Sequence, residues 1–365
     1  MKKIAIVLYG NIRYDGRVQK EIKTLIKNKY NVTLFISKFD KDDKKENYNF
    51  KIEVIEDLLN KKGTIENFIN LLNFKKKIIK KIRDEKFDYI HCNDLNTLFF
   101  SKITSKYGKI VFDAHELFPE SNEKKIKKFL WNLIEKKNIK YIYKVIQPEI
   151  NRKKYFSKKY RLKEKKIELI ENFPLNLSNE LKKGYFFEKY NYKTEKKIAL
   201  YIGAIMQKRG ILEILESLKN NKEIIFFCIG KCLDKNYKEK LYSFIKDNKM
   251  EDRVFFKESI PQAEVLEATN SADISFIFYK NINLNNYYCA SNKLYECLNC
   301  GVKILTNNYP GIISVTKEIP NVYNIKSINV KELKKGIEYL LNITEVKKTE
   351  FYWENQEEKF INIYK

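Results

Sequence analysis

Histidine and cysteine, the side chains that most often bind transition metals, are scarce in this sequence. It has 2 histidines and 6 cysteines among 365 residues. Cys297 and Cys300 form a CxxC pair, but no second pair lies nearby, and Cys297 also belongs to an apolar helical stripe with Leu294 and Leu298. The composition therefore argues against a zinc or redox site and favours reduced thiols in a cytosolic setting.

Long apolar runs are also lacking. No run approaches the roughly 20 residues that cross a bilayer as a helix. The apolar segment 4–9 is too short for a signal peptide and is followed by no small-residue cleavage site. We therefore interpret this segment as a buried first strand and expect a cytoplasmic protein.

Acidic residues are outnumbered, with 47 Asp+Glu against 72 Lys+Arg. A net charge of +25 attracts polyanions, either nucleic acid or an anionic membrane face. The chain is also rich in Lys, Asn, Ile, Tyr and Phe, whose codons are A/T-rich, so genomic base bias is an alternative explanation. Hydrophobic residues make up 44 %, which excludes a disordered chain.

The basic excess is concentrated in the region 123–166, which has 17 Lys/Arg against 4 Asp/Glu. There Phe129, Leu130, Leu133 and Ile134 interleave with basic residues at helical spacing. The pattern predicts an amphipathic helix that lies on an anionic membrane surface. An ordinary helix with a solvated basic face is the alternative. A nucleic-acid-binding protein would place such residues on a dedicated module, so we expect no nucleic-acid partner.

Strand-like apolar runs alternate with helical stretches in two successive series. Such runs separated by helices predict parallel sheets covered on both faces. The length suits two α/β domains, each a doubly wound, Rossmann-like parallel sheet, with a central cleft between them. The predicted strands are 4–9, 32–36, 52–55, 89–92 and 110–113, then 198–202, 224–229, 254–256, 274–278 and 302–305.

One candidate phosphate site begins where the strand 198–202 ends. Gly203 lets another group approach the backbone closely, and Gly210 precedes a predicted helix over 211–218. A helix N-terminus favours anions, and Arg209 beside it can grip a phosphate with two hydrogen bonds. Glycine at strand ends is common, so this segment alone is a weak signal.

A second candidate site is a short helix bounded by Ser291 as N-cap and Gly301 as C-cap. Asn292, Lys293 and Glu296 lie near one face at its start. Lys293 suits a diphosphate and Glu296 suits paired ribose hydroxyls. The alternative is an ordinary Lys–Glu pair on a surface helix.

Together, these and other segments resemble glycosyltransferase family 4, the large group of retaining enzymes with the GT-B fold. The resemblance extends over nearly the whole chain, and the order of the segments makes it specific. The matching segments are Asp15 to Val18 with Glu21 and Leu25, Phe112 to Glu120, Gly203 to Gly210, Ile229 to Lys231, Ser291 to Glu296 with Gly301, and Trp353 to Tyr364.

The resemblance implies an acceptor-side domain over 1–175, completed by a C-terminal helix within 348–365, and a nucleotide-sugar-binding domain over 176–347. It also implies a donor site in the second domain. Arg209 and Lys293 would hold the donor diphosphate there, and Glu296 would bind the ribose. Gly203 and Asn292 complete the predicted donor-binding set.

In the first domain, the resemblance implies that the loop 11–16, with Asp15 and Gly16, closes one side of the sugar pocket. His115 would lie beside the donor sugar and help to position it, whereas the alternative is a structural histidine at a strand end. Two more residues at a strand end could face the cleft, namely His91 and Asp94.

Three positions depart from the family pattern. Tyr288 stands where many members have a Glu, eight residues before the ribose-binding Glu. Ala204 stands where many have an Arg, and the first loop reads Tyr14-Asp15-Gly16 instead of carrying a double glycine. These changes affect the expected donor more than the reaction class.

The expected activity is transfer of a sugar from a nucleotide-diphosphate-sugar, UDP or GDP, with retention of configuration and without a metal or cofactor. The expected acceptor is a membrane-associated glycan or lipid in surface-polysaccharide or glycolipid synthesis, with the protein peripheral on the inner face of a bacterial membrane. Asp40, Asp42 and Asp43 suggest a metal site, but their lysine neighbours favour a solvated loop. The alternatives are a catalytically silent homologue acting as a scaffold or partner subunit, and a sugar-nucleotide epimerase.

Overall fold

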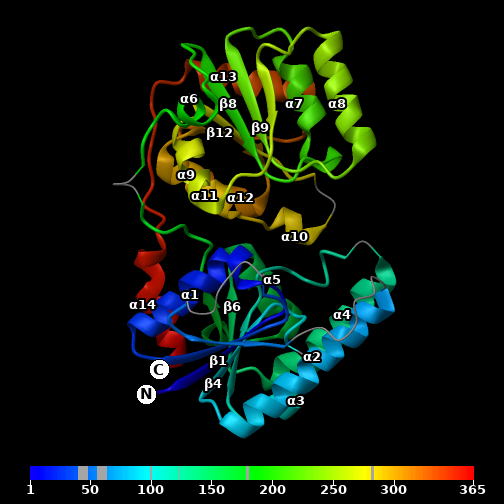
Figure 1. Ribbon diagram of the computed structural model, residues 1–365, viewed down its shortest axis with the longest axis vertical. Helices are drawn as coiled ribbons and strands as arrows, with labels where there is room; N and C mark the ends of the chain where they lie inside the picture. The colour runs from blue at the N-terminus through cyan, green and yellow to red at the C-terminus, as the bar shows by residue number, and fades with distance from the viewer. Residues whose placement is uncertain (40–47, 56–63, 99–100, 123, 178–180, 281–282) are drawn as a thin grey trace. The chain divides into compact units, whose positions relative to one another are not determined.

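The computed structural model describes the chain except for residues 40–47, 56–63, 99–100, 123, 178–180 and 281–282 (Figure 1). The chain divides into two compact units. Unit 1 comprises Met1–Asn172, Asn283–Asn285 and Trp353–Lys365, and unit 2 comprises Phe173–Ile282 and Asn286–Tyr352. A short helix, α10 (Leu284–Tyr287), has residues in both units.

Unit 1 contains a seven-stranded parallel sheet in the order β3-β2-β1-β4-β5-β6-β7. Its strands are β1 (Lys3–Leu8), β2 (Asn31–Ile36), β3 (Lys51–Val54), β4 (Tyr89–Asn93), β5 (Lys109–Asp113), β6 (Lys144–Gln147) and β7 (Ile167–Leu169). Its helices are α1 (Gly16–Lys27), α2 (Thr64–Glu85), α3 (Ser101–Thr104), α4 (Lys125–Asn138), α5 (Ile150–Tyr160) and α14 (Glu357–Ile361).

Unit 2 contains a six-stranded parallel sheet in the order β10-β9-β8-β11-β12-β13, with helices on both faces (Figure 1). Its strands are β8 (Lys197–Ile202), β9 (Ile224–Ile229), β10 (Val254–Lys257), β11 (Ile274–Ile277), β12 (Lys303–Asn307) and β13 (Val322–Ile325). Its helices are α6 (Tyr185–Tyr190), α7 (Ile211–Leu218), α8 (Lys235–Asp247), α9 (Gln262–Asn270), α11 (Asn292–Cys300), α12 (Pro310–Thr316) and α13 (Val330–Asn342).

The prediction of two doubly wound parallel sheets is confirmed, and every predicted strand is present within two residues of its predicted ends. Three further strands of three or four residues, β6, β7 and β13, are not apparent from apolar runs in the sequence. In each sheet the strand order reverses beside the first strand, between β1 and β4 and between β8 and β11. Ligands bind at such reversals, outside the carboxyl ends of the strands.

Helix α1 shows how the local sequence sets the first unit. Asp15 is its N-cap, and the Asp15 carboxylate accepts a hydrogen bond of 3.1 Å from the Val18 backbone N–H. Val18, Ile22 and Leu25 are fully buried on the face toward the sheet. The local sequence thus sets both the start of α1 and the face that it buries.

The C-terminal segment from Trp353 packs against α1 within unit 1 (Figure 1). The buried Trp353 indole donates a hydrogen bond of 2.8 Å to the Thr24 hydroxyl. Lys2 donates to the carbonyl of Tyr364 at 3.0 Å, and the Tyr364 side chain is fully buried. The two ends of unit 1 in the sequence are therefore joined in space.

The CxxC pair has a structural explanation. Cys297 and Cys300 are thiols on α11 and pack in a buried cluster with Leu294 and Leu298. Burial raises the pKa of Cys300 to about 12, so this thiol stays protonated at neutral pH. The apolar-stripe interpretation is confirmed.

Among the described residues, no helix has both the length and the apolarity that crossing a bilayer requires. The acidic residues Asp40, Asp42 and Asp43 lie outside the described residues.

Two glycines that follow neighbouring strands of unit 2 allow a close contact between the two backbone segments. Gly203 follows β8 with φ +145°, and Gly230 follows β9 with φ +152°. The Gly203 N–H donates to Ile229 O at 2.9 Å. A Cβ on Gly230 would overlap the Gly203 carbonyl group, so only glycine fits without a shift of the backbone.

We expect Gly230→Ala to lower the free energy of unfolding by about 1–3 kcal/mol, because alanine is strained at this φ and its Cβ would meet the Gly203 backbone. Gly16→Ala is the matched control, because a Cβ there meets no described heavy atom within 4 Å. Urea unfolding followed by circular dichroism measures both. Equal stability of the two variants would contradict the expectation.

Candidate functional site

Unit 2 has a cavity of about 480 Å³ at the carboxyl ends of β8 and β9, beside the strand reversal. Its walls come from the two strand-end glycine segments, from the segment that precedes α9, and from the start of α11. The residues that line it include Gly203, Ala204, Gly230, Lys231, Ser259, Tyr279, Ser291, Asn292, Lys293 and Glu296. The structure therefore brings together four of the five predicted donor-binding residues.

The N-terminus of α11 supplies the polar wall of this cavity. Ser291 is the N-cap and Gly301 the C-cap, as predicted, so the helix begins at Asn292 inside the cavity lining. The first backbone N–H groups of a helix have no intrahelical partner and attract anions. Glu296, one turn further on, is only 4 % exposed and places its carboxylate on the same wall.

Arg209, the fifth predicted donor-binding residue, lies beside the cavity. It donates to the carbonyl of Phe278 at 3.1 Å, and its guanidinium stacks 4.2 Å from the ring centre of Tyr279, which lines the cavity. Burial lowers the pKa of Lys293, and the nearby charge of Arg209 lowers it further, against the opposing effect of Glu296. Two cations are therefore held close together, an arrangement that an anionic ligand would stabilise.

The positions that depart from the family pattern are also placed. Ala204 lines the cavity, and its carbonyl accepts a hydrogen bond of 2.8 Å from the Tyr201 hydroxyl. The half-buried Tyr288 contacts the ring of Tyr287 at 5.3 Å between centroids, and its backbone lies against Gly311.

Unit 1 has a separate cluster of charged residues at the carboxyl ends of β4 and β5. At its centre, His115 Nε2 lies 3.2 Å from Asp113 Oδ2, and His115 Nδ1 lies 3.7 Å from Asp94 Oδ2. Burial lowers the pKa of His115, but Asp94 and Asp113 outweigh it and raise the pKa to about 10. His115 is therefore positively charged at neutral pH.

Arg17 holds the far side of Asp113. Arg17 Nε lies 2.8 Å from Asp113 Oδ2, and Arg17 Nη2 donates to Oδ1 at 3.1 Å. Both side chains are buried, at 6 % and 0 % exposure. Burial alone would raise the pKa of Asp113, but the Arg17 charge holds it well below its usual range.

Glu21 and His91 complete the cluster and are fully buried. Glu21 Oε1 lies 3.1 Å from Arg17 Nε, and Oε2 lies 3.4 Å from His91 Nε2. Burial and the charge of Asp113 raise the pKa of Glu21 well above its usual range. Burial lowers the pKa of His91 to about 4, and His91 Nδ1 is hydrogen-bonded to the Tyr364 hydroxyl. His91 is therefore neutral at neutral pH.

Glu21, His91 and Asp113 present three potential metal ligand atoms within 4.8 Å of one another. The Arg17 guanidinium already pairs with both carboxyl groups, and a cation in that position opposes a metal ion by charge repulsion. We interpret the cluster as an ion-pair network.

The loop predicted to close the sugar pocket is ordered by its own side chains. Asn11 accepts a hydrogen bond of 3.0 Å from the Arg13 N–H, and Asp15 caps α1. Asp15 also contributes to the raised pKa of His115, so this loop borders the unit 1 cluster.

Arg17, Glu21 and Asp113 were not predicted as site residues, although all three lie in segments that carry the family resemblance. Arg17 and Glu21 are four residues apart on α1, on the same buried side as the apolar Val18, Ile22 and Leu25. A charged pair inside an apolar helical face is the available signal for a buried network.

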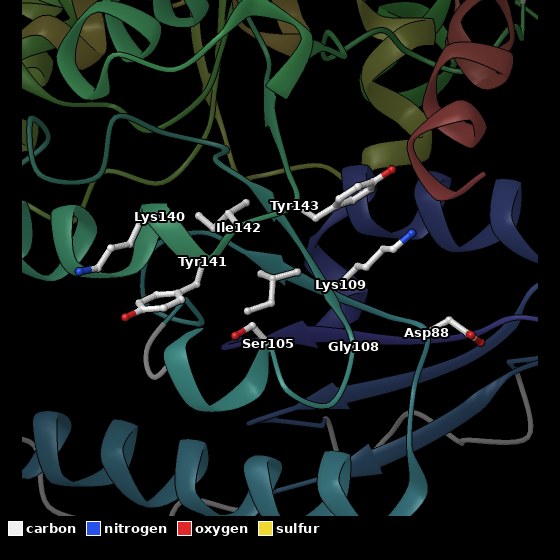
Figure 2. A pocket seen from close by; sticks show the side chains of 9 residues that line it. Asp88, Ser105, Gly108, Lys109, Lys140, Tyr141, Ile142 and Tyr143 are labelled. Carbon is white, nitrogen blue, oxygen red and sulfur yellow. The ribbon is translucent and has the colours of Figure 1, made fainter.

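A further cavity in unit 1, of about 430 Å³, lies at the opposite end of the sheet (Figure 2). Figure 2 shows Lys109, at the amino end of β5, pointing toward Tyr143, which precedes β6. Asp113 is the last residue of β5, so this cavity is separated from the His115 cluster by the length of the strand.

Two family models match the chain in sequence order. The model for "Glycosyltransferase Family 4" matches residues 17–173, and the model for "Glycosyl transferases group 1" matches residues 183–359. No curated protein matches the sequence.

Solved structures match over the full length. Sucrose-phosphate synthase from Thermosynechococcus elongatus is 14 % identical, with a TM-score of 0.72 over 100 % of this chain and 98 % of that one. HepE from Anabaena, in complex with UDP and glucose, is 13 % identical, with a TM-score of 0.69 over 100 % and 97 %. The lipopolysaccharide outer core galactosyltransferase WaaB is 15 % identical, with a TM-score of 0.66 over 99 % and 98 %.

These similarities confirm the expected fold, and the two family models together account for both units. The chain belongs to glycosyltransferase family 4 and is a glycosyltransferase of the GT-B type.

Proposed function

We propose that this glycosyltransferase takes its sugar from a nucleotide-diphosphate-sugar, retains the anomeric configuration, and transfers the sugar to a membrane-associated glycan or lipid. The observation that carries the donor assignment is the unit 2 cavity. Its lining combines the start of α11, the glycine pair, Lys293 and the buried carboxylate of Glu296, and Arg209 lies beside it.

Each part of this cavity suits one part of such a donor. Gly203 and Gly230 allow a diphosphate to approach the backbone, and the start of α11 provides N–H donors. Lys293 and Arg209 supply positive charge, and the carboxylate of Glu296 can accept two hydrogen bonds from ribose hydroxyls. UDP is the favoured nucleotide, since HepE has been solved with UDP and glucose; GDP is the alternative.

Transfer requires the bond between the anomeric carbon and the donor phosphate to break, with its electrons passing to the diphosphate. In the proposed reaction Lys293 and Arg209 stabilise this developing charge, together with the helix dipole of α11. The acceptor hydroxyl attacks the same face of the sugar, and its proton passes to the departing phosphate. His115 helps to position the donor sugar, and the reaction proceeds without a metal or other cofactor.

An exposed apolar stripe on α4 supports a membrane-associated acceptor. Ile126, Phe129, Leu130 and Leu133 are 76, 62, 52 and 39 % exposed and recur at i, i+3, i+4 and i+7. An ordinary amphipathic helix buries such residues against its own domain. Here the stripe faces outward, which favours the membrane interpretation of the basic region.

The other face of α4 holds the helix to unit 1. Glu135 is buried and pairs with Lys159 at 3.0 Å and with the Tyr160 hydroxyl. Trp131 packs edge-on against Phe118, with 4.8 Å between ring centres. The basic side chains around the stripe suit an anionic lipid surface on the inner face of a cell membrane.

A catalytically silent homologue that acts as a scaffold or partner subunit is the second candidate, because Tyr288 and Ala204 depart from the family pattern. It would bind a nucleotide weakly or not at all and would not hydrolyse a donor. The binding measurement below therefore bears on both candidates.

We expect one of UDP, GDP, ADP, CMP and dTDP to bind with a micromolar Kd in isothermal titration calorimetry. Glu296→Ala should weaken that binding at least tenfold, about 1.4 kcal/mol, through loss of the ribose contacts. Glu338→Ala, which removes an exposed carboxylate from α13 of the same unit, is the control and should bind as the wild type does. Absence of binding to folded protein would favour the silent homologue.

We expect the protein to sediment with phosphatidylglycerol vesicles and much less with phosphatidylcholine vesicles, because the surface around the stripe is basic. The double variant Phe129→Ser, Leu130→Ser should bind at least tenfold more weakly, since both side chains would lose burial in the lipid. Leu233→Ser is the control, because Leu233 is 84 % exposed on unit 2. Unchanged sedimentation of the double variant would count against membrane docking by α4.

A further inference from the structure

Both ring nitrogens of His115 face a carboxylate. Asp113 Oδ2 lies 3.2 Å from Nε2, and Asp94 Oδ2 lies 3.7 Å from Nδ1. The Nε2 contact is a hydrogen bond and the longer Nδ1 contact is an ion pair. An ionised carboxylate attracts a protonated ring nitrogen and repels a lone pair, so both contacts are favourable only when each nitrogen carries a proton. A neutral imidazole would present a lone pair to one of the two carboxylates. The geometry therefore selects the imidazolium form.

Arg17 holds the Asp113 carboxylate in place, and this carboxylate in turn holds the His115 ring. Its guanidinium engages both oxygens of Asp113 and also donates to the carbonyl of Ile170 at 3.0 Å and to Asn172 Oδ1 at 2.9 Å. The fork is thereby anchored on α1, on β5 and on the segment after β7. Lysine has one charged nitrogen and cannot reproduce this set of contacts.

We propose that Asp113 and Arg17 are positioning residues for His115, and that they hold its ring as a two-donor cation that cannot accept a proton. The proposal rests on the proposed function, in which His115 helps to position the donor sugar. During transfer the acceptor proton goes to the leaving phosphate, and His115 keeps both of its protons. Its role is that of a preorganised positive charge beside the donor sugar.

The surrounding charges agree with this assignment. Burial lowers the pKa of His115, but three nearby carboxylates raise it to about 10. The cation Arg17 is paired with Asp113, His91 is neutral, and burial raises the pKa of Glu21 well above its usual range. The groups around the ring are Asp15, Arg17 and Glu21 of the α1 region, His91 and Asp94 of the β4 region, Asp113 and Glu116 of the β5 region, and Arg152 of α5, which donates to the His115 carbonyl at 2.8 Å.

Nuclear magnetic resonance tests the proposal directly, because the chain has only 2 histidines. The signal that disappears in His115→Gln identifies His115. In the wild type we expect this signal to stay at its protonated position up to at least pH 8, with both ring nitrogens showing imidazolium shifts. The His91 signal should stay neutral down to about pH 5. A His115 signal that titrates at or below pH 7 would overturn the proposal.

Variants separate the contributions to the pKa of His115. Asp113→Asn should lower it by one unit or more through loss of a carboxylate partner. Asp94→Asn, at a position with 26 % exposure, should lower it in the same direction and serves if the first variant does not fold. Glu85→Gln removes a remote carboxylate of unit 1 and should leave the pKa unchanged. If neither Asp113→Asn nor Asp94→Asn shifts the signal, the carboxylates do not hold the ring.

Kinetics test the positioning role. With the donor identified by calorimetry, the wild-type kcat should show no loss from His115 between pH 6.5 and 8.5. In Asp113→Asn or Asp94→Asn, kcat should fall as the pH rises through the lowered pKa of His115. Arg17→Lys should lower kcat at least tenfold, with a donor KM within about threefold of the wild type and a retained melting temperature. Wild-type kcat and ring signals in Arg17→Lys would exclude Arg17 from this role.

The titration of His115 and the measurements of nucleotide binding and turnover test different proposals, so either proposal can be wrong without the other. The titration needs no substrate, so a silent homologue would still show the protonated ring and its response to Asp113→Asn. A transferase with an unprotonated His115 would show nucleotide binding and turnover but a ring signal that titrates near pH 6.5.

Discussion

The buried ion pair between Arg17 and Asp113 is the interaction on which the unit 1 site depends. Two charges removed from water are costly unless each is fully paired, and removal of one partner leaves the other uncompensated. Arg17 satisfies this condition by contacting Asp113, Ile170 and Asn172 at once. These contacts join residues 96 and more positions apart in the sequence. Through these contacts Arg17 links α1, β5 and the segment after β7, and one Asp113 oxygen also faces His115.

The candidate site of unit 2 differs from that of unit 1 in how its positive charges are placed. In unit 1 the cations Arg17 and His115 each face a carboxylate, so their charges are compensated within the protein. In unit 2, burial lowers the pKa of Lys293 and the charge of Arg209 lowers it further, so two cations repel one another beside the cavity. That repulsion is a cost in the unliganded protein, and an anionic ligand removes it. The arrangement favours the binding of a diphosphate and, to a greater degree, the stabilisation of a departing diphosphate that gains charge.

The sequence predicted what is local and missed what depends on long-range contacts. Apolar runs identified the central strands because these are buried on both faces, whereas β6 and β7 were hidden by the lysines around them. Ser291 and Gly301 stand at the two ends of α11 as predicted, with Gly301 in the left-handed conformation that favours glycine at a C-cap. The partners of Arg17 could not be found in this way, because they meet only when the sheet places β5 beside β4 near the start of α1. The sequence pattern of α1 can indicate that a charged side chain is buried, but it cannot indicate which carboxylate pairs with it.

The strongly basic composition, too, can be interpreted only once the structure shows which side chains are exposed. A bias toward A/T-rich codons adds lysine, asparagine and isoleucine throughout a chain, and it explains a high net charge without any function. Such a bias does not choose which side of a helix faces solvent. On α4 the buried face carries Glu135 and Asn138, while Ile126 and Phe129 are exposed. Exposing large apolar side chains to water is unfavourable, and a bias in amino-acid composition does not offset this cost. The outward stripe is therefore better evidence for a lipid surface than the number of lysines around it.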